Sequence, residues 1–124
     1  MSPRTEDPLD EYQHRSSIAT AAGAAAFARL LDLAEQRDSG QIARIARFLA
    51  ATYNGQVFPL DPFELRAVDI AISDDMLRCL DALRWGRADL HTLIPEGDGR
   101  MQAVIARWGL RWPDGDRRAP MTFS

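Results

Sequence analysis

The segment FARLLDLA, residues 27–34, decides the fold class of this 124-residue chain. Its apolar residues recur at positions i, i+3, i+4 and i+7, the spacing that places side chains on one stripe of an α-helix. The residues that form this stripe are Phe27, Leu30, Leu31 and Ala34. We therefore predict an amphipathic helix from about residue 17 to residue 36, with an Ala-rich first half that a neighbouring helix could approach closely.

The same spacing returns in the segments that follow. A second helix is predicted over Gln41–Tyr53, between the break at Asp38-Ser39-Gly40 and the stop signal Asn54-Gly55. The sequence Asp61-Pro62-Phe63-Glu64 has the form of a capping box, in which the Asp61 carboxylate accepts the N–H of Glu64 and Glu64 reaches back. We expect a short helix to begin there and to lead, through a kink near residues 68–73, into a longer one.

The longer helix is expected to continue as far as Trp85-Gly86. The segment Arg87–Gly99 is ambiguous, because its apolar centre could form one helical turn or a brief strand before the turn at residues 95–99. A last helix is predicted from about Arg100 to Trp108, stopped by Gly109. These elements predict an all-α fold, a compact bundle of four to five helices.

The two ends of the chain lack this periodicity. Residues 1–15 are polar and contain Pro3 and Pro8, and residues 113–124 are similarly irregular. We expect a disordered tail over residues 1–15, one helical domain over residues 16–112, and a flexible C-terminal tail over residues 113–124.

Composition excludes several classes of protein. The net charge is −3 and every basic residue is arginine, which argues against a protein dominated by nucleic-acid binding. The apolar run Ala19–Leu31 contains Gly23 and Arg29, so no membrane span is expected, and the acidic residues before it do not fit a secretory leader. The single cysteine, Cys79, is interpreted as a buried apolar residue. A cytoplasmic location is expected.

Signals for enzyme chemistry are sparse. Asp74 and Asp75 are adjacent and would point about 100° apart on a helix, so the helix dipole is the preferred explanation for both. His91 has no partner at a metal-ligand spacing, and a structural role is preferred for it. We expect neither a metal ion nor a cofactor. The remaining enzyme hypothesis is a site built around His91 with Asp69 or Asp74.

Arginine and tryptophan residues are the best candidates for contacts with a partner. Both Trp108 and Trp112 interleave with arginines near the C-terminus, an arrangement that suits either a protein hot spot or stacking on bases. The residues predicted to bind a protein partner are Trp85, Arg107, Arg111 and Trp112. The alternative, a nucleic-acid surface, would use Arg37, Arg44, Arg47, Arg100, Arg117 and Arg118. Trp108 is interpreted as a core residue.

Three blocks of sequence carry a resemblance to a known family. They comprise residues 30–34 with 39–41 and 47–49, residues 63–69 with 74–77, and residues 90–95 with Gly97, Gly99 and 107–110. Together they resemble a family of small uncharacterised helical proteins encoded on plasmids and integrative elements of proteobacteria. The resemblance implies an accessory protein of a mobile genetic element and implies no reaction.

These observations lead to one main functional expectation. We expect a non-enzymatic interaction module that binds another protein of the element or of its host. A nucleic-acid-binding accessory protein is the alternative, and homodimerisation is a further possibility if the Ala-rich helix leaves an apolar face free.

Overall fold

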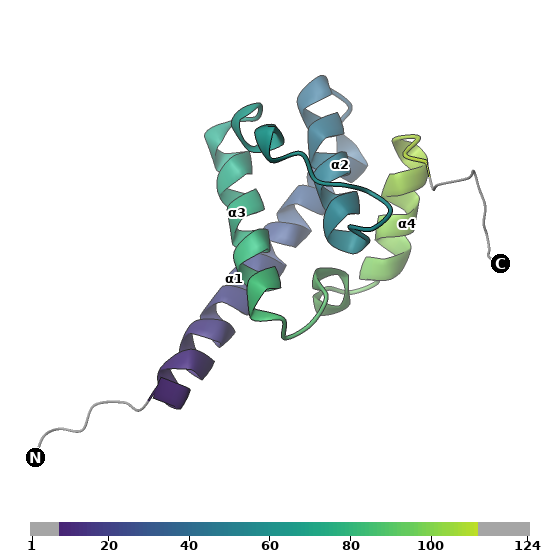
Figure 1. Ribbon diagram of the computed structural model, residues 1–124. Helices are drawn as coiled ribbons and strands as arrows, with labels where there is room; N and C mark the ends of the chain where they lie inside the picture. The colour runs from purple at the N-terminus through teal and green to yellow at the C-terminus, as the bar shows by residue number, and fades with distance from the viewer. Residues whose placement is uncertain (1–7, 112–124) are drawn as a thin grey trace, which may run out of the picture.

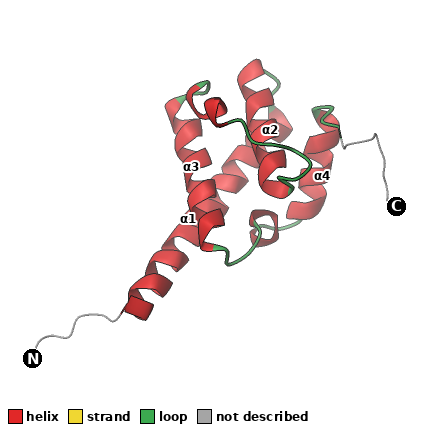
Figure 2. Ribbon diagram, viewed as in Figure 1, coloured by secondary structure: helices red, strands yellow, loops and turns green. Residues whose placement is uncertain are grey.

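The computed structural model describes residues 8–111 and shows an all-α bundle with no strand in that range (Figures 1 and 2). Its elements are α1 (Pro8–Gln36), α2 (Gly40–Tyr53), the 3₁₀ helix η1 (Pro62–Arg66), α3 (Ile70–Trp85), the 3₁₀ helix η2 (Leu90–Leu93) and α4 (Gly97–Arg107). The predicted fold class is confirmed. The short helix leading into a longer one is also confirmed, as η1 followed by α3.

Helix α1 organises the bundle. It packs against α3 in an antiparallel pair, because Gly23 contacts Ala82 whereas Arg29, further along α1, meets Asp75, which comes earlier in α3. A Cβ atom at Gly23 would overlap that of Ala82, so the glycine permits the close approach of the two helices. The side chains of Phe27 and Met76 are fully buried in the core. Figure 1 shows the other helices gathered around the C-terminal half of α1, while its N-terminal end projects away from them.

The structure corrects the predicted start of the first helix. Residues 8–15 were expected to belong to a disordered tail, yet α1 begins at Pro8. Proline is well suited to the first turn of a helix because it lacks the N–H that would be unpaired there, and Asp10 and Glu11 oppose the positive end of the helix dipole. Residues 1–7 and 112–124, which hold the rest of the two predicted tails, lie outside the described residues.

The start of the last helix is also corrected. Gly97 and Gly99 were expected in a turn, but α4 begins at Gly97, three residues before the predicted position. A Cβ atom at Gly97 would overlap the carbonyl oxygen of His91, so only glycine lets the first turn of α4 pack on η2 at this distance. The ambiguous centre of residues 87–99 forms the helical turn η2 rather than a strand.

Helix α1 also bears on the expected absence of a membrane span. Among the described residues it is long and apolar enough to cross a membrane by length and composition alone, contrary to our expectation. A core helix of a bundle has the same composition, and Phe27, Leu30 and Leu31 are completely buried in this one.

Candidate protein-interaction surface

One largely apolar stripe runs along α1 from Leu9 to Leu30. Beginning at Leu9, it alternates steps of three and four residues, which keeps it on one face of the helix. Its members are Leu9, Tyr12, Ser16, Ala19, Gly23, Ala26 and Leu30. From Ser16 onward the stripe is buried, whereas Leu9 is 62% exposed and Tyr12 is 54% exposed. The stripe therefore extends past the end of α3. Helix α3 covers only the part of it from Ser16 onward.

Trp85, the last residue of α3, lies where the covered part of the stripe ends. The Tyr12 ring meets its indole edge-on, with ring centroids 5.0 Å apart. The guanidinium groups of Arg15 and Arg84 lie 5.4 Å and 4.9 Å from the indole centroid, within the range of cation–π attraction. Trp85 is thus an aromatic residue of α3 that contacts two cations and packs against the first turns of α1.

We call this region the tip surface and define it by six residues. These are Leu9, Tyr12, Trp85, Arg15, Arg84 and Arg87. Arg87 is anchored by donating a hydrogen bond to the hydroxyl of Ser17 at 2.7 Å. Arg84 is paired with Asp81, but neither Arg15 nor Arg87 forms an ion pair with any carboxylate of the described residues. Within residues 8–111 the tip surface therefore combines exposed apolar side chains with two arginines that have no carboxylate partner.

A hollow of about 240 Å³ adjoins the tip surface between α1 and α3. Apolar atoms of Ile18, Ala19 and Ala22 line it, together with Trp85. The indole Nε1 of Trp85 is buried and has no hydrogen-bond partner among residues 8–111. An unpaired buried donor costs about 1–3 kcal/mol. The packing at this end of the bundle therefore leaves one buried donor unpaired within the described residues.

The predicted partner-binding residues do not form one surface. Arg107 donates to the carbonyl oxygens of Ala34 and Arg37 at 3.1 and 3.0 Å, and the indole of Trp108 also donates to Ala34 at 2.9 Å. These bonds satisfy carbonyl groups at the C-terminal end of α1, which has no basic residue in its own last turn. Trp85 contacts α1 near residue 12, roughly 30 Å away along the helix at 1.5 Å per residue.

The other members of the predicted set are placed as follows. Arg111 is exposed and forms no hydrogen bond or ion pair with the other described residues, and Trp112 lies outside them. Trp108 is half-buried against the core, as the sequence suggested. Of the four predicted partner-binding residues, only Trp85 belongs to the tip surface.

The arginines of the nucleic-acid alternative are largely engaged by acids. Arg44 and Arg47 bind the two carboxylate oxygens of Glu64 at 2.6 and 2.9 Å. Arg100 forms a two-pronged ion pair with Glu35, through bonds of 2.8 Å, and also contacts Asp32. Arg37 has no carboxylate partner among the described residues, and Arg117 and Arg118 lie beyond them. The predicted nucleic-acid surface therefore carries less unpaired positive charge than its arginine residues alone indicate.

Glu64 does not complete the predicted capping box. The Asp61 carboxylate accepts the N–H of Phe63 rather than that of Glu64, and the Glu64 side chain turns inward to α2. Burial raises the pKa of Glu64, but hydrogen bonds and charge from Arg47 and Arg44 outweigh it and hold the pKa below its ordinary value. Two guanidinium cations attract a carboxylate more strongly than one backbone N–H does, which explains the difference.

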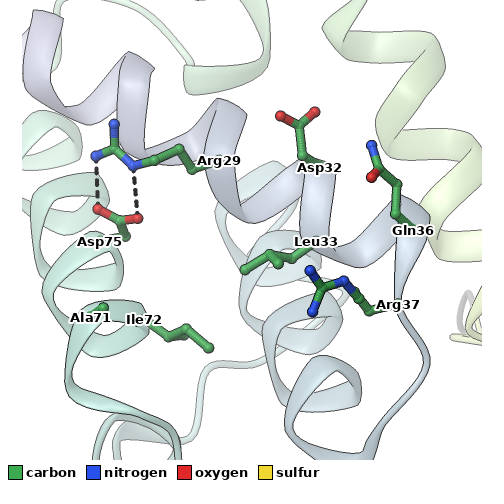
Figure 3. Close-up of a pocket in the computed structure, with 8 residues that line it drawn as sticks. All are labelled: Arg29, Asp32, Leu33, Gln36, Arg37, Ala71, Ile72 and Asp75. Atoms are coloured by element: carbon green, nitrogen blue, oxygen red, sulfur yellow. Dashed lines mark hydrogen bonds and ion pairs between the residues drawn. The ribbon is translucent and has the colours of Figure 1, made fainter.

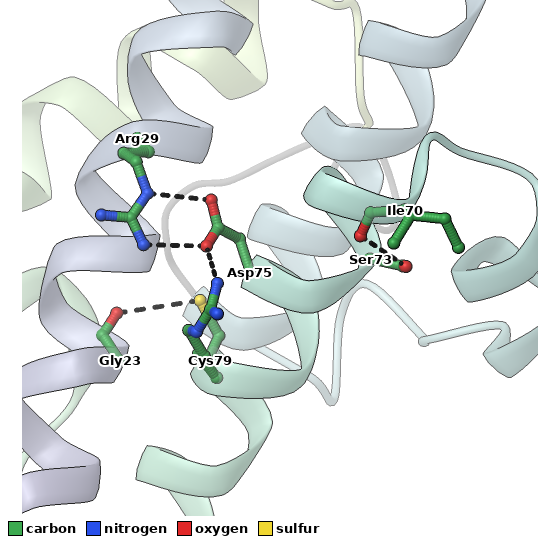
Figure 4. Close-up of polar contacts among 7 residues, drawn as sticks. Gly23, Arg29, Ile70, Ser73, Asp75 and Cys79 are labelled. Atoms are coloured by element: carbon green, nitrogen blue, oxygen red, sulfur yellow. Dashed lines mark hydrogen bonds and ion pairs between the residues drawn. The ribbon is translucent and has the colours of Figure 1, made fainter.

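Asp75 likewise departs from its predicted role. Helix α3 begins at Ile70, so Asp74 and Asp75 lie beyond its first turn, where the dipole explanation does not apply. Asp75 is 8% exposed and binds Arg29 through two bonds of 3.0 and 2.8 Å, with Arg78 as a third donor at 2.8 Å (Figure 4). Hydrogen bonds from Arg29 lower the pKa of Asp75 despite burial. Asp74 is exposed.

A second hollow, of about 320 Å³, lies beside the Arg29–Asp75 pair (Figure 3). Of its charged groups, Arg29 and Asp75 bind each other and Asp32 is engaged by Arg100, whereas Arg37 has no carboxylate partner among the described residues. Cys79 is completely buried nearby, and burial raises the pKa of its thiol to about 12, so it is not a nucleophile near neutral pH. The expected buried role of Cys79 is confirmed.

The hypothetical enzyme site does not assemble. His91 stacks edge-on against Tyr53 with centroids 4.8 Å apart, whereas the Asp69 carboxylate receives a bond from Gln41. Asp69 precedes α3 and His91 follows it, so the length of that helix separates them. No group of three or more His, Cys, Asp or Glu side chains among the described residues could hold a metal ion.

The fold and the tip surface together define a small all-α domain with an exposed helical end. The profile of the family described as "Family of unknown function (DUF7673)" matches residues 24–109, so the chain belongs to that family. The match begins after the projecting part of α1. No curated protein and no solved structure matches the chain.

Proposed function

We propose that this protein is a non-enzymatic protein-interaction module whose docking site is the tip surface. The observation that carries the proposal is the uncovered continuation of the α1 stripe, where Leu9 and Tyr12 remain more than half exposed on an otherwise buried face. A helical stripe of this kind is normally covered by a neighbouring element. No described element of the chain covers it.

The residue types of the tip surface also support a protein partner. Tyrosine, tryptophan and arginine are the residues enriched at the energetic centres of protein interfaces. At the tip surface Tyr12 and Arg15 both contact Trp85. The side chains are thus ordered before any partner binds, which reduces the entropy lost on binding.

The wider setting belongs to the same proposal. We take the protein to be an accessory protein of a plasmid or integrative element of proteobacteria, acting in the bacterial cytoplasm on a protein of the element or its host. The resemblance of three sequence blocks to such proteins supports this setting. It supplies no reaction, which agrees with a binding role.

Site-specific photocrosslinking in the bacterium that carries the gene tests the proposal. A photoreactive phenylalanine analogue is placed at Tyr12 in one variant and at Leu77 of α3 in another. The two positions are 54% and 53% exposed, so they offer the probe equal access. We expect protein adducts from position 12 and few from position 77, unchanged by nuclease treatment.

Two results would count against the proposal. Equal adducts at both positions, or none at position 12, would mean that the tip surface is not a docking site. Adducts that disappear with nuclease would favour the nucleic-acid alternative instead.

A further inference from the structure

The stripe of α1 has the register of a coiled-coil seam. Its members follow alternating steps of three and four residues, so they take positions a and d of a seven-residue repeat, with Leu9 at a and Tyr12 at d. From Ser16 onward the seam is buried against the bundle, where α3 packs on it. Among residues 8–111 no helix covers the first two turns or so of this seam. The uncovered part therefore has the shape of a site for one more helix.

Arginines without a carboxylate partner among the described residues flank the uncovered seam on both sides. Arg15 takes a g position, about 60° around α1 from Tyr12, and its guanidinium lies over the Trp85 indole. Arg87 lies on the other side, because it donates to the hydroxyl of Ser17, which takes a b position. In a coiled coil the charges that flank the seam select a partner of opposite charge.

The acidic residues of this region do not neutralise the two sides of the seam. Glu11 takes a c position, about 100° around α1 from Tyr12, and Asp10 lies further round, so both face away from the seam. On α3, Asp81 is bound to Arg84 at 2.6 Å. The charge presented along the uncovered seam by the described residues is therefore positive.

We infer that the occupant of the tip surface is an acidic amphipathic helix of the partner protein. This helix continues the line of α3 beyond Trp85 and lays its apolar side chains on Leu9 and Tyr12. Its acidic side chains face Arg15 and Arg87. The inference rests on the proposed function and names the chemistry of the partner.

The tip surface has room for such a helix. Figure 1 shows the first turns of α1 clear of α2, α3 and α4, so a helix can lie along them without meeting the bundle. The hollow lined by Ile18 and Ala22 lies beside Arg15 and can take a further apolar side chain of the partner. Because the contact on α1 spans only a few turns, we expect micromolar affinity and the salt sensitivity of a small, charged interface.

The test begins with a displayed library of helical peptides and the full chain as bait. Positions a and d of the peptides vary among apolar residues, and positions e and g are either all glutamate or all lysine. We expect the selected peptides to carry glutamate. One selected peptide and its lysine counterpart are then titrated by fluorescence anisotropy. The lysine counterpart should bind at least tenfold more weakly, and the affinity of the glutamate peptide should fall with added salt.

Charge reversal in the chain tests the contact from the other side. Arg15→Glu should weaken binding of the glutamate peptide at least tenfold and strengthen binding of the lysine peptide, a gain that loss of folding would not produce. The matched control is Arg66→Glu, on η1 at the other end of α3. Arg66 is also exposed, has no carboxylate partner among the described residues and lies over an aromatic ring, 4.6 Å from the centroid of Phe63. This control should bind both peptides like the unaltered chain, and circular dichroism establishes that each variant keeps its helical content.

Several results would overturn the inference. They are a library that gives no binder, selected peptides without a preference for glutamate, and equal losses in Arg15→Glu and Arg66→Glu. Adducts between position 12 and another protein would then leave the proposed function standing with a partner of different chemistry. Absence of any adduct at that position would refute both.

Discussion

Replacing Gly97 by alanine should destabilise the bundle, whereas the same replacement at Gly99, two residues later in α4, should not. A Cβ atom at Gly97 would overlap the carbonyl oxygen of His91 and lie 2.8 Å from its carbonyl carbon and 3.0 Å from Cγ1 of Ile94. Two of these atoms belong to the backbone of η2, which the buried side chain of Leu90 fixes in place. A Cβ atom at Gly99 would meet nothing within 4 Å.

The magnitudes follow from two opposing effects. Alanine in place of glycine stabilises a helix interior by up to about 1 kcal/mol, and this is the only effect expected at Gly99. At Gly97 the overlap must be relieved by moving η2, and overpacking of this kind costs about 1–3 kcal/mol or more. Because the gain from alanine applies to both variants, we expect them to differ by the overpacking cost, about 1–3 kcal/mol or more, which is at least roughly 4 °C in Tm for a domain of this size.

Urea denaturation followed by circular dichroism at 222 nm measures this difference directly. Both variants should unfold in a single transition with similar slopes, so the midpoints can be compared. Equal midpoints for the two variants, or a higher midpoint for Gly97→Ala, would refute the close approach of α4 to η2.

Two further predictions concern the ion pairs and the helix cap. Because the pKa values of Glu64 and Asp75 are lowered in the folded chain, the stability they contribute is present above their unfolded pKa of about 4 and is lost as the pH falls through the folded values. The urea midpoint should accordingly drop below about pH 4, and a midpoint constant down to pH 2 would contradict the ion pairs. Arg107→Ala should lower the free energy of unfolding by about 1 kcal/mol, because carbonyl groups at the end of α1 lose their donors. Arg111→Ala, at an exposed neighbouring position, should change it by less than about 0.5 kcal/mol, and equal effects would show that Arg107 is not a cap.

The sequence predicted the fold class and most helix bounds because those depend on local patterns. The apolar spacing around Phe27 and the stop at Gly86 both act within a few residues, and the structure agrees with each. The start of α1 was missed although a local signal existed. The stripe that contains Ala26 and Leu30 continues backward to Tyr12 and Leu9, but the polar composition of residues 8–15 and the proline at position 8 are typical of a tail.

The partners of charged residues could not be predicted in the same way. Glu64 was assigned a local role in a capping box, yet it binds Arg44 and Arg47, which are 20 and 17 residues away along the chain. A capping box is recognisable from four consecutive residues, whereas the approach of η1 to α2 depends on the packing of the whole bundle. The same applies to Arg107. Its two acceptors, the carbonyl oxygens of Ala34 and Arg37, lie 73 and 70 residues earlier in the chain.

The candidate surface was found only in part for a related reason. Trp85 was singled out for its residue type, but its contacts with Tyr12 and Arg15 depend on how α1 and α3 pair. Gly23 sets that pairing by allowing the backbone of α1 to approach Ala82. The position of Trp85 at the end of the covered stripe therefore follows from a glycine more than sixty residues earlier in the chain.

The projecting end of α1 is suited to binding because of how it is kept helical. An isolated helix of a few turns is marginal in water, because the first turn costs more conformational entropy than its single hydrogen bond recovers. The tip needs no such nucleation, since it extends a helix already fixed by α3 and capped at its far end by Arg107 and Trp108. Each added residue gains a hydrogen bond, so the tip stays ordered without being covered. A partner then meets a preformed helix and loses less entropy on binding than it would with a tail that had to fold.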